Sequence, residues 1–248
     1  MNNIEKLIVA LDVPTFEEAR KLIDTLSPVV EVFKIGSQLF TACGPVAIRY
    51  VLSKGKKVFL DLKFHDIPNT VAHAVSAAVV LGEPGHEMMD EAQHKVVFSE
   101  KGLFMLTVHT VGGQEMMERS VEAATKQAET LGVRRPLIIG ITVLTSEKCG
   151  DNIADIVLER ANLAKKSGLD GVVASSQEAS LIRQKFGKDF VIVTPGIRPQ
   201  EAECGDQKRV TTPAEAISNG SDFLVVGRPI VKAEDPLSEA QKILEEIK

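Results

Sequence analysis

Eight short runs rich in β-branched and other apolar residues alternate along this chain with longer amphipathic segments. The short runs predict strands, and the amphipathic segments predict helices. The predicted strands are residues 7–13, 30–36, 57–64, 104–110, 137–143, 171–175, 190–194 and 223–227. The predicted helices are residues 15–26, 45–53, 69–81, 114–131, 153–167, 177–186, 213–219 and 236–247.

Strand–helix alternation of this kind favours parallel strands joined by right-handed crossovers. Eight such units in 248 residues match the (β/α)8 TIM barrel, an α/β fold. The alternative is a doubly wound sheet, which carries a glycine-rich turn after its first strand. The turn here, residues 12–15, reads Asp-Val-Pro-Thr and has no glycine. We therefore expect one TIM-barrel domain over residues 1–248.

Residues 83–102 interrupt the alternation between the third predicted helix and the fourth predicted strand. Such connections usually need about two to six residues, so we interpret this stretch as an inserted segment. Within it, His86, Asp90 and His94 are spaced four apart, as on one helix face. A metal site on that face is the alternative. A solvated helix on the barrel exterior is the favoured interpretation, and we predict no metal site.

Composition and charge exclude several classes of protein. The chain is 44% hydrophobic, enough to form a core and to rule out disorder. A net charge of −5 with no Trp and one Tyr argues against a nucleic-acid partner. The apolar runs are shorter than the ~20 residues of a membrane span. Three distant cysteines and an N-terminus without a signal-peptide pattern favour the cytoplasm.

Charged residues lie near the ends of the first three predicted strands, where TIM barrels build active sites. Asp12 and Lys34 belong to the first two strands, and Asp61 and Lys63 to the third. Two-residue spacing in a strand places Asp61 and Lys63 on one face, toward the barrel interior. An internal salt bridge is the structural alternative, but such bridges rarely add stability. We therefore favour a functional array.

Other polar residues near strand ends have two interpretations each. From position alone, Asp66 fits the cap of the helix that begins near Pro68. Structural roles are favoured for His65 and His109. Thr145, shortly after the fifth predicted strand, could bind a ligand or cap a turn, and the pattern does not decide between the two.

The loops after the seventh and eighth predicted strands are the usual phosphate site of this fold. The first contains Gly196 and Arg198, and the second contains Gly227 and Arg228. Glycine lets the backbone approach a ligand, and a guanidinium binds phosphate oxygens. The alternative is that Gly-Pro turns simply end the strands. The two arginines favour a small phosphorylated ligand whose other end meets the Lys/Asp array.

Residues 61–70, Asp-Leu-Lys-Phe-His-Asp-Ile-Pro-Asn-Thr, closely resemble the signature of the orotidine 5'-monophosphate decarboxylase family. Further matching segments follow in the family's order: 11–13, 33–36, 143–146, 194–199, 205–207 and 226–229. The resemblance covers nearly the whole chain. Residues 83–102 depart from it, at a point that we expect to lie on the stability face of the barrel, away from the site. A minor departure is Ala174, where the family commonly has a cysteine.

The resemblance implies removal of CO2 from orotidine 5'-monophosphate, giving UMP in pyrimidine synthesis, without metal or organic cofactor. It implies a homodimer with active sites at the subunit interface. Lys34, Asp61 and Lys63 of one subunit and Asp66 of the other would form the catalytic array. Lys63 would protonate C6 of the pyrimidine, and Asp61 would lie near the substrate carboxylate.

The resemblance also implies how the rest of the substrate is held. Asp12 and Lys34 would bind the ribose hydroxyls, and Ile67 would bind the substrate. Thr70, from the partner, would help to hold it. The pyrimidine and the phosphate would be bound by Thr145, Gln207, Arg198, Gly227 and Arg228.

Three alternatives stay open. A Mg²⁺-dependent sugar-phosphate decarboxylase or synthase of the same superfamily shares the Asp-x-Lys-x-x-Asp core. A carboxylate at the Lys34 position would help such an enzyme hold Mg²⁺, and a cation there is unfavourable. A Schiff-base aldolase using Lys63 and a non-catalytic phosphate-binding barrel are the others.

Overall fold

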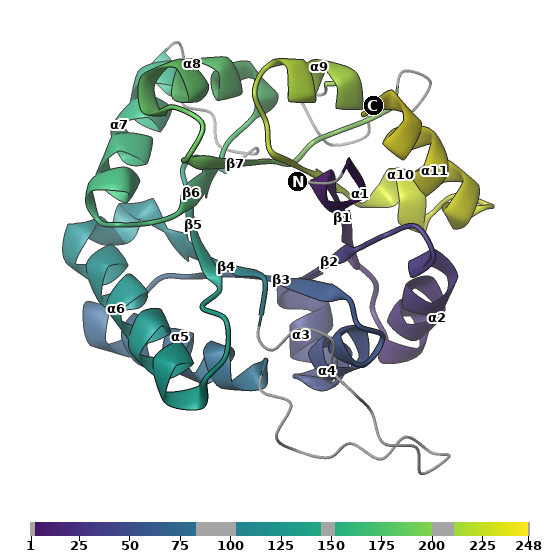
Figure 1. Cartoon of the computed structure of the whole chain (residues 1–248), viewed down its shortest axis with the longest axis horizontal. Helices are drawn as coiled ribbons and strands as arrows, with labels where there is room; N and C mark the ends of the chain where they lie inside the picture. Colours follow the sequence, from purple (N-terminus) through teal and green to yellow (C-terminus); the bar gives the residue numbers. More distant parts are fainter. Residues whose placement is uncertain (1–2, 83–102, 145–151, 200–210, 248) are drawn as a thin grey trace.

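Eight parallel strands close into a barrel in the order β1 to β8 (Figure 1). The computed structural model describes residues 3–82, 103–144, 152–199 and 211–247. The strands are β1 (Leu7–Ala10), β2 (Val32–Gly36), β3 (Lys57–Phe64), β4 (Met105–His109), β5 (Leu137–Ile141), β6 (Gly171–Val173), β7 (Val191–Thr194) and β8 (Phe223–Val226). The predicted TIM barrel is confirmed.

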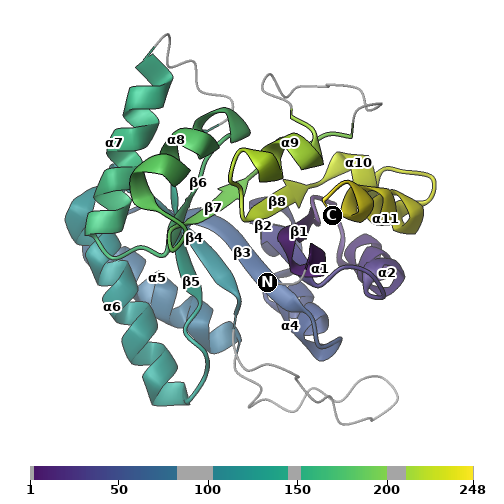
Figure 2. The same cartoon turned by 45° about the horizontal axis from the view of Figure 1, so that its top comes forward.

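Helices form a ring around the barrel, and the short helix at Asn3–Lys6 lies inside this ring against β1 and β8 (Figure 1; Figure 2). They are α1 (Asn3–Lys6), α2 (Phe16–Leu26), α3 (Ser37–Cys43), α4 (Val46–Ser53), α5 (Pro68–Leu81), α6 (Gly113–Leu131), α7 (Ile153–Lys166), α8 (Ser176–Phe186), α9 (Pro213–Ser218), α10 (Arg228–Val231) and α11 (Pro236–Glu246), with a 3-10 turn at Thr110–Gly112. The sequence pattern missed α1, α3, α10 and this turn, because segments of three to seven residues are too short to show helical periodicity.

Several predicted strands were too long at their carboxyl ends. The prediction for β1 continued to residue 13 and that for β5 to residue 143, whereas these strands end at Ala10 and Ile141. Apolar residues continue into the loops there, since Leu11 and Val143 are buried without being strand residues. Apolar runs indicate burial, and burial extends past the end of the ladder.

The barrel has two apolar layers, one inside it and one between strands and helices. The inner layer consists of Ile8, Val32, Phe59, Met105, Ile139, Val193 and Phe223, all at most 1% exposed. Strand side chains alternate between faces, so a residue two positions beyond an inner-layer residue also points inward. Lys34, Asp61 and Thr107 stand two beyond Val32, Phe59 and Met105. The apolar inner layer therefore forms the floor beneath these polar residues.

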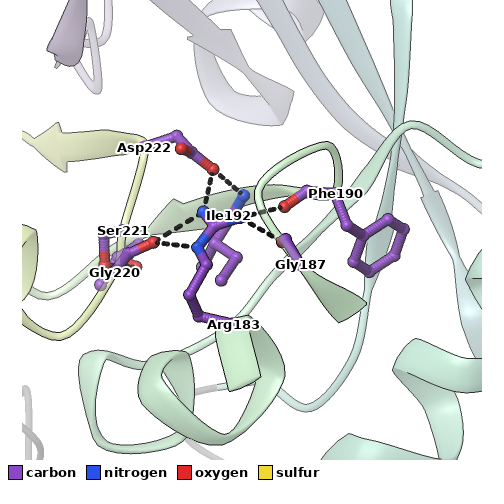
Figure 3. Close-up of polar contacts among 8 residues, drawn as sticks. Arg183, Gly187, Phe190, Ile192, Gly220, Ser221 and Asp222 are labelled. Atoms are coloured by element: carbon purple, nitrogen blue, oxygen red, sulfur yellow. Dashed lines mark hydrogen bonds and ion pairs between the residues drawn. The ribbon is translucent and has the colours of Figure 1, made fainter. Parts of the chain in front are cut away.

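Ion pairs tie strand beginnings together at the opposite, amino-terminal end of the barrel. The Arg183 guanidinium lies 2.6 Å from Asp222 Oδ2, which also accepts the backbone N–H of Ile192 at 2.8 Å (Figure 3). Arg135 and Asp170 repeat this arrangement at β5, with an ion pair of 2.6 Å. In both cases an aspartate just before one strand accepts a backbone N–H from the preceding strand: Asp170 from Ile138 of β5, and Asp222 from Ile192 of β7.

The segment 83–102, with His86, Asp90 and His94, lies outside the described residues. Its neighbours Gly82 and Leu103 follow α5 and precede β4, so they lie at the amino-terminal end of the barrel. That end is away from the carboxyl ends of the strands. Within the described residues, no helix is long and apolar enough to cross a membrane.

Candidate active site

Four charged side chains meet at the carboxyl ends of β1, β2 and β3. Lys34 Nζ lies 3.1 Å from Asp12 Oδ1 and 3.5 Å from Asp61 Oδ2. Lys63 Nζ lies 2.8 Å from the same Asp61 oxygen. The structure thus brings together the four residues that the sequence pattern singled out, and one oxygen of Asp61 faces both lysines.

The centre of this array is buried. Asp61 is 7% exposed and Lys34 is 8% exposed. Burial by itself would raise the pKa of Asp61. The positive charges of Lys34 and Lys63 and hydrogen bonds from Lys63 and Thr107 oppose that effect, and they hold the pKa below its ordinary value. Asp61 is therefore ionised at neutral pH, and two lysines with two aspartates sum to zero charge.

β3 is irregular at the site. Leu60 pairs with Leu106 and Phe64 with Val108, so Asp61, Leu62 and Lys63 stand opposite Thr107 alone. Such a bulge bends a strand and re-aims its side chains. Lys63 has φ +53°, the one positive value among the described non-glycine residues. A conformation of this kind costs about 1–3 kcal/mol and persists where the surroundings impose it.

Thr107 on β4 joins the two sides of the bulge. Its hydroxyl donates to Asp61 Oδ1 at 3.0 Å and accepts the backbone N–H of Lys63 at 2.9 Å. Thr107 could not be identified from the sequence pattern. Threonine is common in strands, so its presence in one is no signal of a site.

Gly36 leaves room for the Lys34 ammonium. A Cβ at this position would lie 3.0 Å from Lys34 Nζ and 3.4 Å from Asp12 Oδ1. Even an alanine would therefore force the ammonium to shift. Gly36, the last residue of β2, thus lets the Lys34 ammonium lie within reach of both Asp12 and Asp61.

A cavity of about 830 Å³ opens above the array. Residues of the loops after β7 and β8 line its other side: Pro195, Gly196, Ile197, Arg198, Gly227 and Arg228. Arg198 is buried, Arg228 is exposed, and Gly196 has φ +81°, which favours glycine. Both predicted arginines therefore line the same cavity as the charged array. Glu18, Gln38 and Lys232 also line it, and the sequence analysis named none of them.

Three predicted residues lie outside this cavity lining. Asp66, Ile67 and Thr70 are exposed, and Ile67 is 66% exposed. The suggestion that Asp66 caps the helix is wrong. Ile67 holds the N-cap position of α5 without a side-chain cap bond, and Asp66 Oδ1 accepts the neighbouring N–H of Ile67 at 2.6 Å. Proline at the first position of α5 needs no N–H partner, which removes part of the need for a cap.

The remaining predicted residues fall into two groups. Thr145 and Gln207 lie outside the described residues. His65 and His109 contact each other with ring centroids 5.5 Å apart, and neither lines the cavity. Among the residues that the structure describes, no cluster of three or more His, Cys, Asp or Glu side chains could hold a metal ion.

A (β/α)8 barrel with buried charges at the strand ends and arginines after β7 and β8 defines a TIM-barrel enzyme for phosphorylated small molecules. Comparison with known proteins narrows this class. Residues 5–243 match the model of the "Orotidine 5'-phosphate decarboxylase / HUMPS family". The chain belongs to this family.

Relatives that are named orotidine 5'-phosphate decarboxylase match nearly the whole length of this chain. An orotidine 5'-phosphate decarboxylase of Geotalea daltonii is 45% identical, over 98% of this chain and 95% of the relative. An orotidine 5'-phosphate decarboxylase of Moorella thermoacetica is also 45% identical, over 100% of this chain and 94% of the relative. The crystal structure of orotidine 5'-phosphate decarboxylase from Lactobacillus acidophilus superposes with a TM-score of 0.78 at 32% identity, covering 98% of this chain and 99% of that one.

Proposed function

We propose that this protein is a carboxy-lyase that converts orotidine 5'-monophosphate to UMP in pyrimidine biosynthesis. The observation that carries the proposal is the convergence of Lys34 and Lys63 on one oxygen of Asp61, on the floor of a cavity that Arg198 and Arg228 also line. The relatives of 45% identity support the choice of substrate. The three well-separated cysteines support a reducing, cytoplasmic setting.

Lys63 is the proposed proton donor. When the bond between C6 and the carboxylate breaks, CO2 leaves and the electron pair stays on C6, where no conjugated group accepts it. An ammonium aimed at that carbon stabilises the developing charge and then transfers its proton to C6. Lys63 is left as a neutral amine, which regains a proton from water. Its ion pair with Asp61 positions the ammonium before the reaction.

The Asp61 carboxylate would destabilise the bound substrate, which carries a carboxylate, and not the product, which has lost it. Its pKa lies below the ordinary value, so it is a carboxylate when the substrate arrives. A second carboxylate next to it is repelled, and this repulsion disappears once CO2 has left. Interactions that are more favourable in the transition state than in the bound substrate raise kcat.

Arg198 and Arg228 are the proposed phosphate ligands, and Gly227 lets the backbone approach the same group. Guanidinium–phosphate pairs are strong, directional hydrogen bonds. Asp12 and Lys34 lie between this end of the cavity and Lys63, where the ribose hydroxyls would be. Thr145 and Gln207 stay predicted ligands of the pyrimidine and the phosphate.

No metal or organic cofactor is needed for this chemistry. The Lys34 ammonium lies within 3.5 Å of both Asp12 and Asp61, where a metal-dependent relative would use carboxylates to hold Mg²⁺. A divalent cation beside this ammonium would be repelled. The residues therefore fit the decarboxylase better than a Mg²⁺-dependent sugar-phosphate enzyme.

We further propose that two copies of the chain share their active sites. Asp66, Ile67 and Thr70 form an exposed group at the start of α5, outside the cavity of their own chain. The side chain of Ile67 is apolar and 66% exposed, as expected for a residue that a partner covers. In a symmetric dimer these residues would complete the partner's site. The acidic net charge supports the absence of a nucleic-acid partner.

The decisive experiment follows the absorbance loss of orotidine 5'-monophosphate with purified protein, with and without EDTA. Turnover that resists EDTA and is absent from Lys63→Ala supports the proposal. Lack of turnover by a folded dimer contradicts it. EDTA-sensitive turnover of a keto-sugar phosphate would instead support the metal-dependent enzyme. Borohydride trapping of Lys63 with such a substrate would support the aldolase.

A further inference from the structure

We propose that Thr107 is a positioning residue that sets the relative orientation of Asp61 and Lys63. The inference rests on the proposed decarboxylation, because it assigns Thr107 to the same site. Thr107 is fully buried on the inward face of β4, with one hydrogen bond to each of the two residues. It contacts the groups that would meet the substrate without lining the cavity itself.

The bulge in β3 leaves the backbone of Lys63 without its regular ladder partner. Three residues of β3 face Thr107 alone, so the ladder cannot satisfy every backbone group in its regular pattern. The N–H of Lys63 donates instead to the Thr107 hydroxyl at 2.9 Å. Lys63 holds a left-handed conformation that a lysine disfavours. A hydrogen bond to its N–H at this point is a direct way to stabilise that conformation.

The hydroxyl also sets the orientation of the Asp61 carboxylate. A threonine hydroxyl has one proton, and here it is donated to Asp61 Oδ1. That leaves Oδ2 facing both Lys34 and Lys63. Without the hydroxyl, Oδ1 loses a buried donor, and the carboxylate is free to turn. Lys63, which pairs with this carboxylate, would then lose its defined position.

Packing alone does not account for a threonine at this position. Valine has nearly the same shape and would fill the same space without placing a polar atom in a fully buried position. A buried hydroxyl is unfavourable unless it is hydrogen-bonded. In Thr107 both hydrogen bonds go to residues of the charged array.

The test compares Thr107→Val, which removes the hydroxyl, with Thr107→Ser, which keeps it. Thr110→Val is the matched control. Thr110 is also buried, and its hydroxyl donates to the backbone carbonyl of Ile141 at 2.8 Å, away from Asp61 and Lys63. Loss of a hydrogen bond to a charged group predicts a kcat about 10- to 100-fold lower in Thr107→Val. We expect an unchanged KM for the substrate, kcat within about threefold of wild type in Thr107→Ser, and wild-type kinetics in Thr110→Val.

A crystal structure of Thr107→Val supplies a readout that does not depend on turnover. We expect Lys63 to leave the positive-φ region or its Nζ to move away from Asp61. If Thr107→Val is not recovered folded, Thr107→Ala removes the same hydroxyl. Wild-type kcat in a folded variant without the hydroxyl, or an unchanged Lys63 conformation, overturns the inference. Absence of turnover in the wild type would contradict the proposed function instead, and the crystal structure would still decide the role of Thr107.

Discussion

Lys63 Nζ and Asp61 Oδ2 lie 2.8 Å apart, although the strand segment that carries both residues is bulged. In a regular strand, residues two apart are separated by about 6.6 Å along the chain and point the same way. Here the left-handed backbone of Lys63 changes the direction of the side chain within that distance. The ion pair thus forms within the bulge, and the chemistry proposed for Lys63 depends on this ion pair.

Replacing Lys63 with alanine should abolish turnover and leave the barrel folded. A general acid accounts for about 10²–10⁴-fold in rate, and electrostatic stabilisation by the ammonium adds to this. Asp61 keeps Lys34 as a partner at 3.5 Å, so its buried carboxylate is not left without a cation. Steady-state kinetics with circular dichroism as a check of folding would measure both effects. A kcat near that of wild type would contradict the assignment of the acid.

Replacing Asp61 with asparagine should lower the free energy of unfolding at neutral pH by at most about 3–5 kcal/mol, because it removes the buried carboxylate that faces both lysines and leaves Lys34 with Asp12 alone. Burial acts to raise the pKa of Asp61, but the charges of Lys34 and Lys63 hold this pKa below its ordinary value in the folded protein. A lowered pKa gives stability that is present above the ordinary pKa and is lost as the pH falls through the folded value.

The difference in stability between wild type and Asp61→Asn should therefore be constant above about pH 5 and shrink below the ordinary aspartate pKa. Urea unfolding at several pH values from neutral to strongly acidic would measure it. A difference that does not change with pH would mean that Asp61 is not a carboxylate stabilised by the two lysines.

Replacing Arg228 with alanine should weaken phosphate binding, raising KM for orotidine 5'-monophosphate about 10- to 100-fold, since hydrogen bonds between charged groups are lost. Turnover of orotidine, which lacks the phosphate, should be unaffected. Arg119→Ala is a suitable control because Arg119 pairs with Glu122 on an exposed part of α6. An equal loss of kcat/KM for both substrates would show that Arg228 supports the structure of the barrel and does not bind the phosphate.

Mixing Lys63→Ala with Asp66→Ala should restore activity to two inactive proteins. In a hybrid dimer with shared sites, one site takes Lys63 from one chain and Asp66 from the other, and both are wild type. With random exchange of subunits, half the dimers are hybrids, and each has one intact site of two, so about a quarter of wild-type activity should return. If exchange is demonstrated and activity stays absent, the two residues do not form one site.

Replacing Arg183 with alanine should destabilise the barrel without changing kcat. The guanidinium donates to Asp222 and to three backbone carbonyls at the amino-terminal end of the strands (Figure 3). Its removal should cost about 1.5–3 kcal/mol, as for hydrogen bonds between charged groups. Arg135→Ala removes the corresponding ion pair with Asp170 and should lower the stability measured by urea unfolding by a similar amount. A selective loss of kcat in either variant would mean that this end of the barrel affects the site.

Local sequence pattern determined the barrel and much of its site. Alternating apolar runs predicted all eight strands, because a strand buried on both faces must be apolar along its length. The same pattern makes a charge at a strand end conspicuous, which is why Asp12, Lys34, Asp61 and Lys63 could be named. The arginines after β7 and β8 followed from their place in the fold.

Tertiary structure alone decided how these residues meet. The bulge arises from the pairing of β3 with β4, and the hydrogen bond from Lys63 to Thr107 spans 44 residues of sequence. The Arg183–Asp222 pair spans 39. Periodicity records which face of an element is buried, and it depends on near neighbours in the chain. The register between two strands depends on how their side chains fit, so the left-handed Lys63 and the role of Thr107 became visible only in the folded barrel.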